Sequence, residues 1–126
     1  MFSDTHFMKE ALKQAQIAFD EDEVPVGAVI VHNHRIIARA YNQVEKLQDP
    51  TAHAEMLAIT AATNAIGSKY LHECSLYVTL EPCYMCGSAL GWAQLSQLVY
   101  SASDPQKGFA NLEKNILHTK TKIISG

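Results

Sequence analysis

The stretch CSLYVTLEPCYMCGSALGWA, residues 74–93, is expected to change from a strand to a helix within a few residues. Its first seven residues are rich in β-formers and predict a short strand. Pro82 follows almost at once and breaks this strand, and residues 83–93 then predict a helix. Cys83 and Cys86 therefore fall at the beginning of a helix that directly follows a strand.

The remaining elements are predicted from apolar spacing and from turn-forming residues. Helices are expected at residues 5–19, where apolar side chains recur every three or four positions, and at residues 52–65, between Pro50 and Gly67. The other β-rich runs are residues 24–31, 35–41, 98–101 and 121–125. The first two of these runs predict an antiparallel hairpin, and the alternation of strands and helices after it favours an α/β layered domain with a partly parallel sheet.

Composition restricts the class of protein. The chain has 126 residues, of which 48% are hydrophobic, and this fits a single domain with one core. A net charge of −3 gives no global positive field that would attract nucleic acid. The N-terminal residues carry charges throughout and lack the apolar run of a signal peptide or membrane span, so we expect a cytoplasmic protein without membrane association.

The cysteines indicate metal or redox chemistry. Three cysteines cannot all pair within one chain, and two of them, Cys83 and Cys86, form a C-x-x-C. At the start of a helix, the helix dipole and unpaired backbone N–H groups lower thiolate pKa values, and thiolates at this spacing suit zinc. The chain has no second C-x-x-C to complete a structural site. His53, at the start of the helix at residues 52–65, would supply a third ligand and leave the fourth position open to water, as in a catalytic zinc site.

Glu55 completes a pattern with these three ligands. A carboxylate beside the metal, but not bound to it, can accept a proton from the activated water and pass it to a ring nitrogen and a leaving amine. The segments His53-Ala54-Glu55 and Pro82-Cys83-Tyr84-Met85-Cys86 match the H-x-E and P-C-x-x-C signature of zinc deaminases.

The same residues also have other interpretations. A thioredoxin-like redox pair would account for Cys83 and Cys86 but would leave His53 and Glu55 unexplained. Cys74 reads as a small buried apolar residue. Trp92 could stack on a base, pack in the core or lie in a subunit interface.

Longer segments carry a resemblance to a known family. VPVGAVIV, DPTAHAEMLAI, LYVTLEPCYMCGSAL and VYSASDPQKG together resemble the bacterial tRNA-specific adenosine deaminases of the cytidine deaminase-like superfamily, from about residue 24 to residue 108. The resemblance implies a three-layer α/β/α fold with a central mixed five-stranded sheet. It also implies hydrolytic conversion of adenosine to inosine at the wobble position of a tRNA anticodon, by a homodimer with one Zn²⁺ per subunit.

The resemblance also implies roles for single residues. His53, Cys83 and Cys86 occupy the metal-ligand positions and Glu55 the proton-shuttle position. Asn42 matches a residue that hydrogen-bonds the target nucleotide, and Asp104 and Lys107 would approach the anticodon backbone. An extruded base needs a pocket, and we expect its walls to include Val26, Ala54 and the chain at residues 80–82, which ends at Pro82.

The sequence leaves two alternatives open. Trp92-Ala93 also resembles the guanine deaminase branch, so the alternative function is deamination of a free nucleobase or nucleoside such as guanine or cytosine. A noncatalytic zinc-stabilised RNA-binding protein is a third hypothesis, against which Glu55 argues. Family members typically continue into a C-terminal helix, whereas this sequence stops at TKIISG. We therefore expect residues 1–126 to form a single deaminase domain, and one interpretation is that it lacks that helix.

Overall fold

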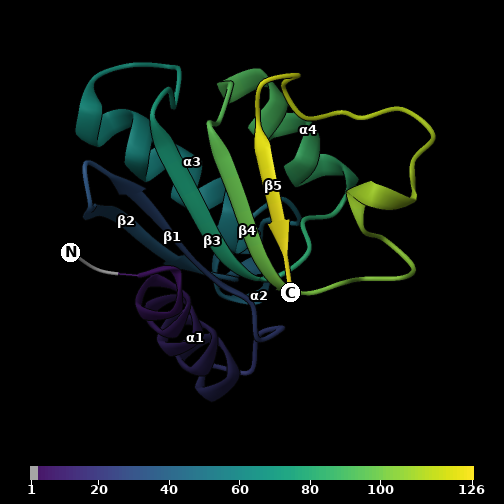
Figure 1. The fold of residues 1–126 in the computed structure, drawn as a ribbon. Helices are drawn as coiled ribbons and strands as arrows, with labels where there is room; N and C mark the ends of the chain where they lie inside the picture. Colours follow the sequence, from purple (N-terminus) through teal and green to yellow (C-terminus); the bar gives the residue numbers. More distant parts are fainter. Residues whose placement is uncertain (1–2) are drawn as a thin grey trace.

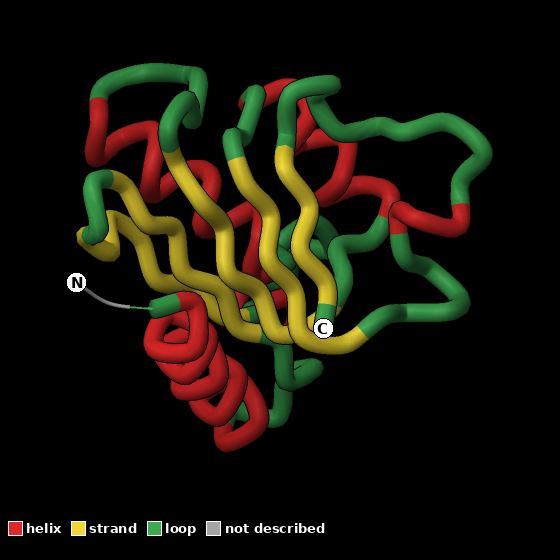
Figure 2. The backbone as a smooth tube through the Cα atoms, in the orientation of Figure 1, coloured by secondary structure: helices red, strands yellow, loops and turns green. Residues whose placement is uncertain are grey.

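The computed structural model describes residues 3–126 as one five-stranded sheet with helices on both of its faces (Figures 1 and 2). The strand order in the sheet is β2-β1-β3-β4-β5. The strands are β1 Gly27–His32, β2 Arg35–Tyr41, β3 Cys74–Leu80, β4 Gln97–Ala102 and β5 Lys122–Ser125. β1 pairs antiparallel with both β2 and β3, whereas β3, β4 and β5 are parallel. The expected mixed five-stranded sheet is confirmed.

Helices cover the two faces of this sheet unequally. Their bounds are α1 Asp4–Asp20, α2 Val44–Leu47, α3 Ala54–Ile66, α4 Tyr84–Ala93 and the 3-10 helix η1 Phe109–Asn111. Figure 1 shows α1 on one side of the sheet and α3 and α4 on the other, which confirms the three-layer α/β/α arrangement. The three long helices agree with the sequence prediction to within two residues at each end, but α2 and η1 were not predicted. In the part of the chain that the structure describes, no helix is long and apolar enough to cross a membrane.

Each face of the sheet has its own apolar core. Beneath α1, Phe7 and Ala11 pack against Val29, Tyr77 and Val99. On the other face, a larger cluster joins the alanines of α3 to residues of α4 and of the central strands; it includes Ala58, Ala62, Leu90, Ile30, Leu76 and Leu98. Small side chains on α3 let this helix lie close to the sheet, which fixes the direction in which its N-terminus points.

Short turns fix the positions of the hairpin and of α3. Asn33 and His34 both have positive φ values, 50° and 62°, as in the two-residue turns that join antiparallel strands. α3 ends at Gly67, which adopts a left-handed conformation with φ 69°. This is the C-terminal stop expected from the sequence. The opposite end of α3 begins after His53, and α4 begins after Cys83, so each of these two helices has a predicted metal ligand as its N-cap residue.

Candidate active site

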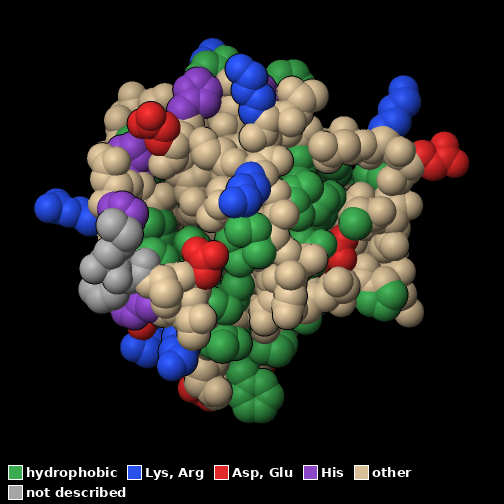
Figure 3. Space-filling model, in the orientation of Figure 1, with side chains coloured by type: hydrophobic (Ala, Val, Ile, Leu, Met, Phe, Trp, Pro, Cys, Tyr) green, Lys and Arg blue, Asp and Glu red, His purple; other side chains and the backbone are tan. Residues whose placement is uncertain are grey.

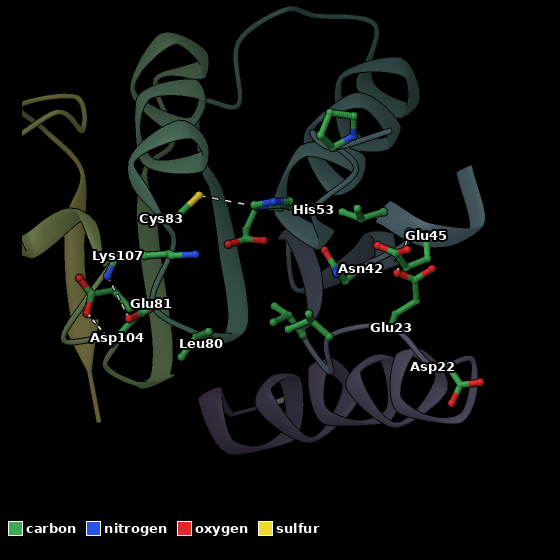
Figure 4. Close-up of a pocket in the computed structure, with 15 residues that line it drawn as sticks. Asp22, Glu23, Asn42, Glu45, His53, Leu80, Glu81, Cys83, Asp104 and Lys107 are labelled. Carbon is green, nitrogen blue, oxygen red and sulfur yellow. Dashed lines mark hydrogen bonds between the residues drawn. The ribbon is translucent and has the colours of Figure 1, made fainter. Parts of the chain in front are cut away.

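The N-termini of α3 and α4 bring three potential metal ligands together. His53 Nδ1 lies 3.6 Å from Cys83 Sγ and 3.5 Å from Cys86 Sγ. Figure 4 shows His53 and Cys83 pointing toward each other from the two helix starts. All three ligand atoms lie within 4.8 Å of one another. Cys74 is buried at the start of β3 and is not part of this cluster.

The spacing of these atoms fits a tetrahedral zinc ion. Zinc binds cysteine sulfur at about 2.3 Å and histidine nitrogen at about 2.0–2.1 Å, which places tetrahedral S and N ligands about 3.6 Å apart. The two observed S···N distances, 3.6 and 3.5 Å, match that separation. Two sulfurs and one imidazole also form a soft donor set that favours zinc over magnesium or calcium.

The two cysteines differ in how they hold their protons. A hydrogen bond from Cys86 lowers the pKa of Cys83 to about 5, with a further contribution from His53. Cys86 keeps its proton, because its hydrogen bond to Cys83 and its burial both raise its pKa. Cys83 is therefore a thiolate at neutral pH. Because metal binding requires deprotonated sulfur, a cation between the two sulfurs would replace the proton that they share.

Glu55 lies in the first turn of α3, beside the same cluster. Its side chain is 4% exposed, and burial raises its pKa to about 7. A carboxyl group that titrates near neutral pH can both accept and donate a proton under working conditions. The position and the pKa of Glu55 fit the proton-transfer role expected from the sequence.

A cavity of about 720 Å³ opens beside Glu55 and the metal-ligand cluster. Its volume lies within the range of about 300–1,000 Å³ that small-molecule sites occupy. It is lined by Asp22, Glu23, Val24, Val26, Asn42, Val44, Glu45, Pro50, His53, Glu55, Leu80, Glu81, Cys83, Asp104 and Lys107.

The cavity includes most, but not all, of the predicted binding residues. Val26, Asn42, Asp104 and Lys107 lie in its lining, as expected, on segments that are far apart in the sequence. Ala54 and Pro82 do not line it, because both are almost completely buried. Ala54 packs in the core beneath α3, and its small side chain faces the sheet side of the helix.

Two buried carboxylates in the lining were given no role by the sequence analysis: Glu23 was not expected there, and Glu81 was expected only as part of the wall at residues 80–82. Glu23 accepts hydrogen bonds from the backbone N–H groups of Glu45 (3.0 Å) and Lys46 (2.8 Å), and so holds the start of α2 against the cavity. Glu81 accepts from the N–H groups of Asp104 and Ala110 on the opposite wall. A glutamate beside the strand break at Pro82 was the available signal for Glu81, but its hydrogen-bond partners lie more than twenty residues away.

The lining is strongly acidic. Six Asp or Glu side chains contribute to it, and Lys107 is the one Lys or Arg among the described residues that line it. On the face shown in Figure 3, Lys and Arg side chains are scattered and do not form one basic patch. Positive charge at the cavity therefore depends on Lys107.

Comparison with known proteins agrees with this geometry. Residues 1–102 match the model of the cytidine and deoxycytidylate deaminase zinc-binding region, a span that contains His53, Glu55, Cys83 and Cys86. A tRNA-specific adenosine deaminase of Aquifex aeolicus is 50% identical over 116 residues, which are 92% of this chain and 77% of the relative. The tRNA-specific adenosine deaminase of Bacillus subtilis is 43% identical over 131 residues, with 100% of this chain and 81% of the relative covered.

Two solved structures are also similar to this chain. A structure from a study of A-to-I editing by tRNA:A34 deaminases at the wobble position of transfer RNA is 42% identical and superposes with a TM-score of 0.91, covering 97% of this chain and 98% of that one. A guanine deaminase from Bacillus subtilis is 39% identical with a TM-score of 0.79, covering 81% and 66%. The chain therefore belongs to the cytidine and deoxycytidylate deaminase family and, within it, to the tRNA-specific adenosine deaminases.

Proposed function

We propose that this protein converts adenosine to inosine at the wobble position of a tRNA anticodon, with one zinc ion held by His53, Cys83 and Cys86. The observation that carries the proposal is the convergence of these three ligands, at zinc-compatible distances, with the buried Glu55 beside a cavity of nucleoside size. The reaction adds water to C6 of adenine and releases ammonia, so no oxidant or second substrate is needed.

Zinc at this site would supply the Lewis acidity that makes water a nucleophile at neutral pH. The remaining chemistry belongs to the chain. Glu55 takes one proton from the attacking water and delivers it to the purine ring nitrogen. It then moves the second proton of that water, from the new hydroxyl group on C6, to the amine, which leaves as ammonia when the C6–N bond breaks. Its burial beside the cluster keeps bulk water from competing for that proton.

The cavity lining suggests how the base is held. Adenine in an anticodon loop must leave its stack before C6 can reach the site, and the cavity would receive the extruded base. Asn42 is buried in the lining and has an amide that can pair with a nucleotide edge, while Val26 offers an apolar wall. Asp104 and Lys107 lie on the wall beside Glu81 and would approach the anticodon backbone.

We also propose that the protein works as a homodimer in the cytoplasm and that residues 1–126 form a single deaminase domain. Trp92 on α4 is 83% exposed beside a groove that also includes Tyr70, Ile116 and Leu117. An exposed tryptophan next to apolar side chains is typical of an interface core. Sedimentation analysis should show a dimer that Trp92→Glu converts to monomer; a wild-type monomer at micromolar concentration would contradict this proposal.

One experiment tests the proposed reaction. The zinc-loaded protein is incubated with an anticodon stem-loop that has adenosine at the wobble position and, separately, with guanine, cytosine and cytidine; inosine and ammonia are then measured. We expect inosine only at the wobble position and no ammonia from the free substrates. Ammonia from guanine without inosine in the stem-loop would replace the proposal with the guanine deaminase alternative.

A further inference from the structure

Glu81 closes the loop at residues 104–110 onto the strand end beside the metal ligands. Its side chain is 5% exposed. One carboxylate oxygen, Oε1, accepts from the N–H of Asp104 at 3.0 Å, and the other, Oε2, accepts from the N–H of Ala110 at 2.9 Å. A single buried carboxylate therefore holds both ends of this loop. A buried carboxylate is costly unless both oxygens are hydrogen-bonded, and this one satisfies that condition with backbone donors.

The hydrogen bonds continue from Asp104 to Lys107. Asp104 Oδ1 accepts from the N–H groups of Gln106 and Lys107, both at 3.0 Å, and the carbonyl oxygen of Asp104 accepts from the N–H of Gly108 at 3.0 Å. The backbone of Lys107 is thus tied to Asp104, whose own backbone is tied to Glu81. Figure 4 shows Glu81, Asp104 and Lys107 together on one wall of the cavity.

Gly108 is the position at which the loop approaches Glu81 most closely. A Cβ atom at Gly108 would lie 2.2 Å from Glu81 Oε2 and 2.3 Å from its Cδ atom. Gly108 also forms a bridge with Cys83, and the N–H of Phe109 donates to the carbonyl of Pro82 at 3.0 Å. The carboxylate is therefore enclosed between the loop and the segment that carries a metal ligand, and a larger residue at position 108 would displace it.

We propose that Glu81 is a positioning residue that holds Lys107 at the mouth of the cavity to contact a phosphate of the RNA substrate. The inference rests on the proposed function. An RNA backbone approaching this cavity meets a lining with six acidic side chains, of which Glu23, Glu55 and Glu81 are buried, and a single Lys or Arg among the described residues, so the placement of that one cation determines whether a phosphate is attracted. A lysine on an anchored backbone loses less conformational freedom on binding than one on a mobile loop.

Glu81→Gln is the direct test. The substitution keeps the shape of the side chain but replaces one acceptor oxygen with an NH₂ group, which then faces a backbone N–H and cannot accept from it. We expect the dissociation constant and the KM of a wobble-adenosine stem-loop to rise about tenfold, the effect of one lost charge-assisted hydrogen bond, with a smaller change in kcat. Zinc content should stay at one ion per chain.

Lys107→Ala shows whether the effect passes through the lysine. It should raise the dissociation constant by a similar factor and reduce the salt dependence of binding by about 0.7 in the slope of log K against log salt, the value for one phosphate contact on a single strand. The double variant Glu81→Gln, Lys107→Ala should bind the stem-loop no more weakly than Lys107→Ala alone. Gly108→Ala, which disturbs the same contact from the loop side, should reproduce Glu81→Gln. Lys69→Ala is the matched control, because Lys69 lies beyond the far end of α3 and should leave both slope and affinity unchanged.

Three results would overturn the inference. Additive effects of Glu81→Gln and Lys107→Ala would show that Glu81 does not act through Lys107. If Glu81→Gln lowered the zinc content or kcat but left the RNA affinity unchanged, Glu81 would support only the metal site. If RNA binding by Lys107→Ala kept the salt dependence of the wild type, Lys107 would not contact a phosphate. Affinity measured by fluorescence anisotropy needs no turnover, so these comparisons stand even if the stem-loop is not deaminated, which is the separate failure of the proposed reaction.

Discussion

The Sγ atom of Cys86 lies 3.5 Å from Nδ1 of His53, although the two residues are 33 positions apart and belong to different helices. Cys86 is fully buried, and its thiol and the imidazole of His53 converge with Cys83 in one group that could hold a metal ion. The alanine-rich face of α3 positions His53, and the strand-to-helix turn after β3 positions Cys86. The candidate metal site is therefore a consequence of how two helices begin on one sheet.

Cys86→Ser is expected to release the zinc. A serine hydroxyl has nearly the size of the thiol but is a much weaker zinc ligand, so elemental analysis should find well under one ion per chain, and the melting temperature should fall because bound metal stabilises the fold. Cys74→Ala is the matched control, since Cys74 is also buried but lies outside the cluster. Full zinc occupancy in Cys86→Ser would remove Cys86 from the ligand set.

Glu55→Gln is expected to separate metal binding from turnover. The amide keeps the shape of the side chain but cannot accept and return a proton, so kcat should fall by about 10²–10⁴-fold while zinc content stays at one per chain. Stem-loop deamination and elemental analysis on the same preparation measure both quantities. A variant that loses zinc and activity together would show that Glu55 supports the metal and is not a proton carrier.

The raised pKa of Glu55 predicts a pH dependence of stability in zinc-free protein. Burial moves this pKa from 4.5 to about 7, so between these pH values the folded state keeps a proton that the unfolded state releases. The free energy of unfolding should therefore fall as pH rises from 4.5 to 7, by about 3 kcal/mol from this group, and show no further change from it above 7. The lowered pKa of Cys83 acts in the opposite direction over part of this range.

Comparison with Glu55→Gln isolates the contribution of Glu55. The substitution removes the titrating group but keeps Cys83. As pH rises, the variant should therefore become more stable than zinc-free wild type, and the difference in the free energy of unfolding should reach its full size near pH 7. Urea unfolding at several pH values after chelation measures it. A difference that does not change between pH 4.5 and 7 would show that Glu55 is ionised in the folded protein across that range.

Local patterns in the sequence were sufficient for the main elements and for the three residues that converge in the candidate metal site. β3 was predicted with its observed bounds because its β-formers are followed at once by a proline, and α3 because Pro50 and Gly67 delimit it. β1 begins three residues later than predicted. Near Pro25 the chain makes a tight turn in which the N–H of Val26 donates to the carbonyl of Val24, so these two residues line the cavity and are not part of the sheet.

Long-range hydrogen bonds were beyond sequence reasoning. The short helix α2 has only four residues, too few for a periodic pattern, and its start is held by Glu23 from a distant loop. Glu81 depends in the same way on a loop more than twenty residues away. Ala54 was expected in the pocket wall. Successive helical residues are rotated by about 100°, however, and this rotation places Ala54 toward the core.

Gly27→Ala is expected to disturb the packing of α1 on the sheet. A Cβ atom at Gly27 would lie 2.1 Å from the carbonyl oxygen of Ala11 and 2.3 Å from the backbone nitrogen of Ala15, and backbone atoms within a helix cannot move aside individually. The helix must shift as a unit and lose contacts with β1, so the free energy of unfolding should fall by about 3 kcal/mol or more in urea titrations. Gly67→Ala is the control: no atom lies within 4 Å of its Cβ, and only the positive φ opposes it, at a cost of about 1 kcal/mol. Equal losses in the two variants would show that α1 does not depend on close approach at Gly27.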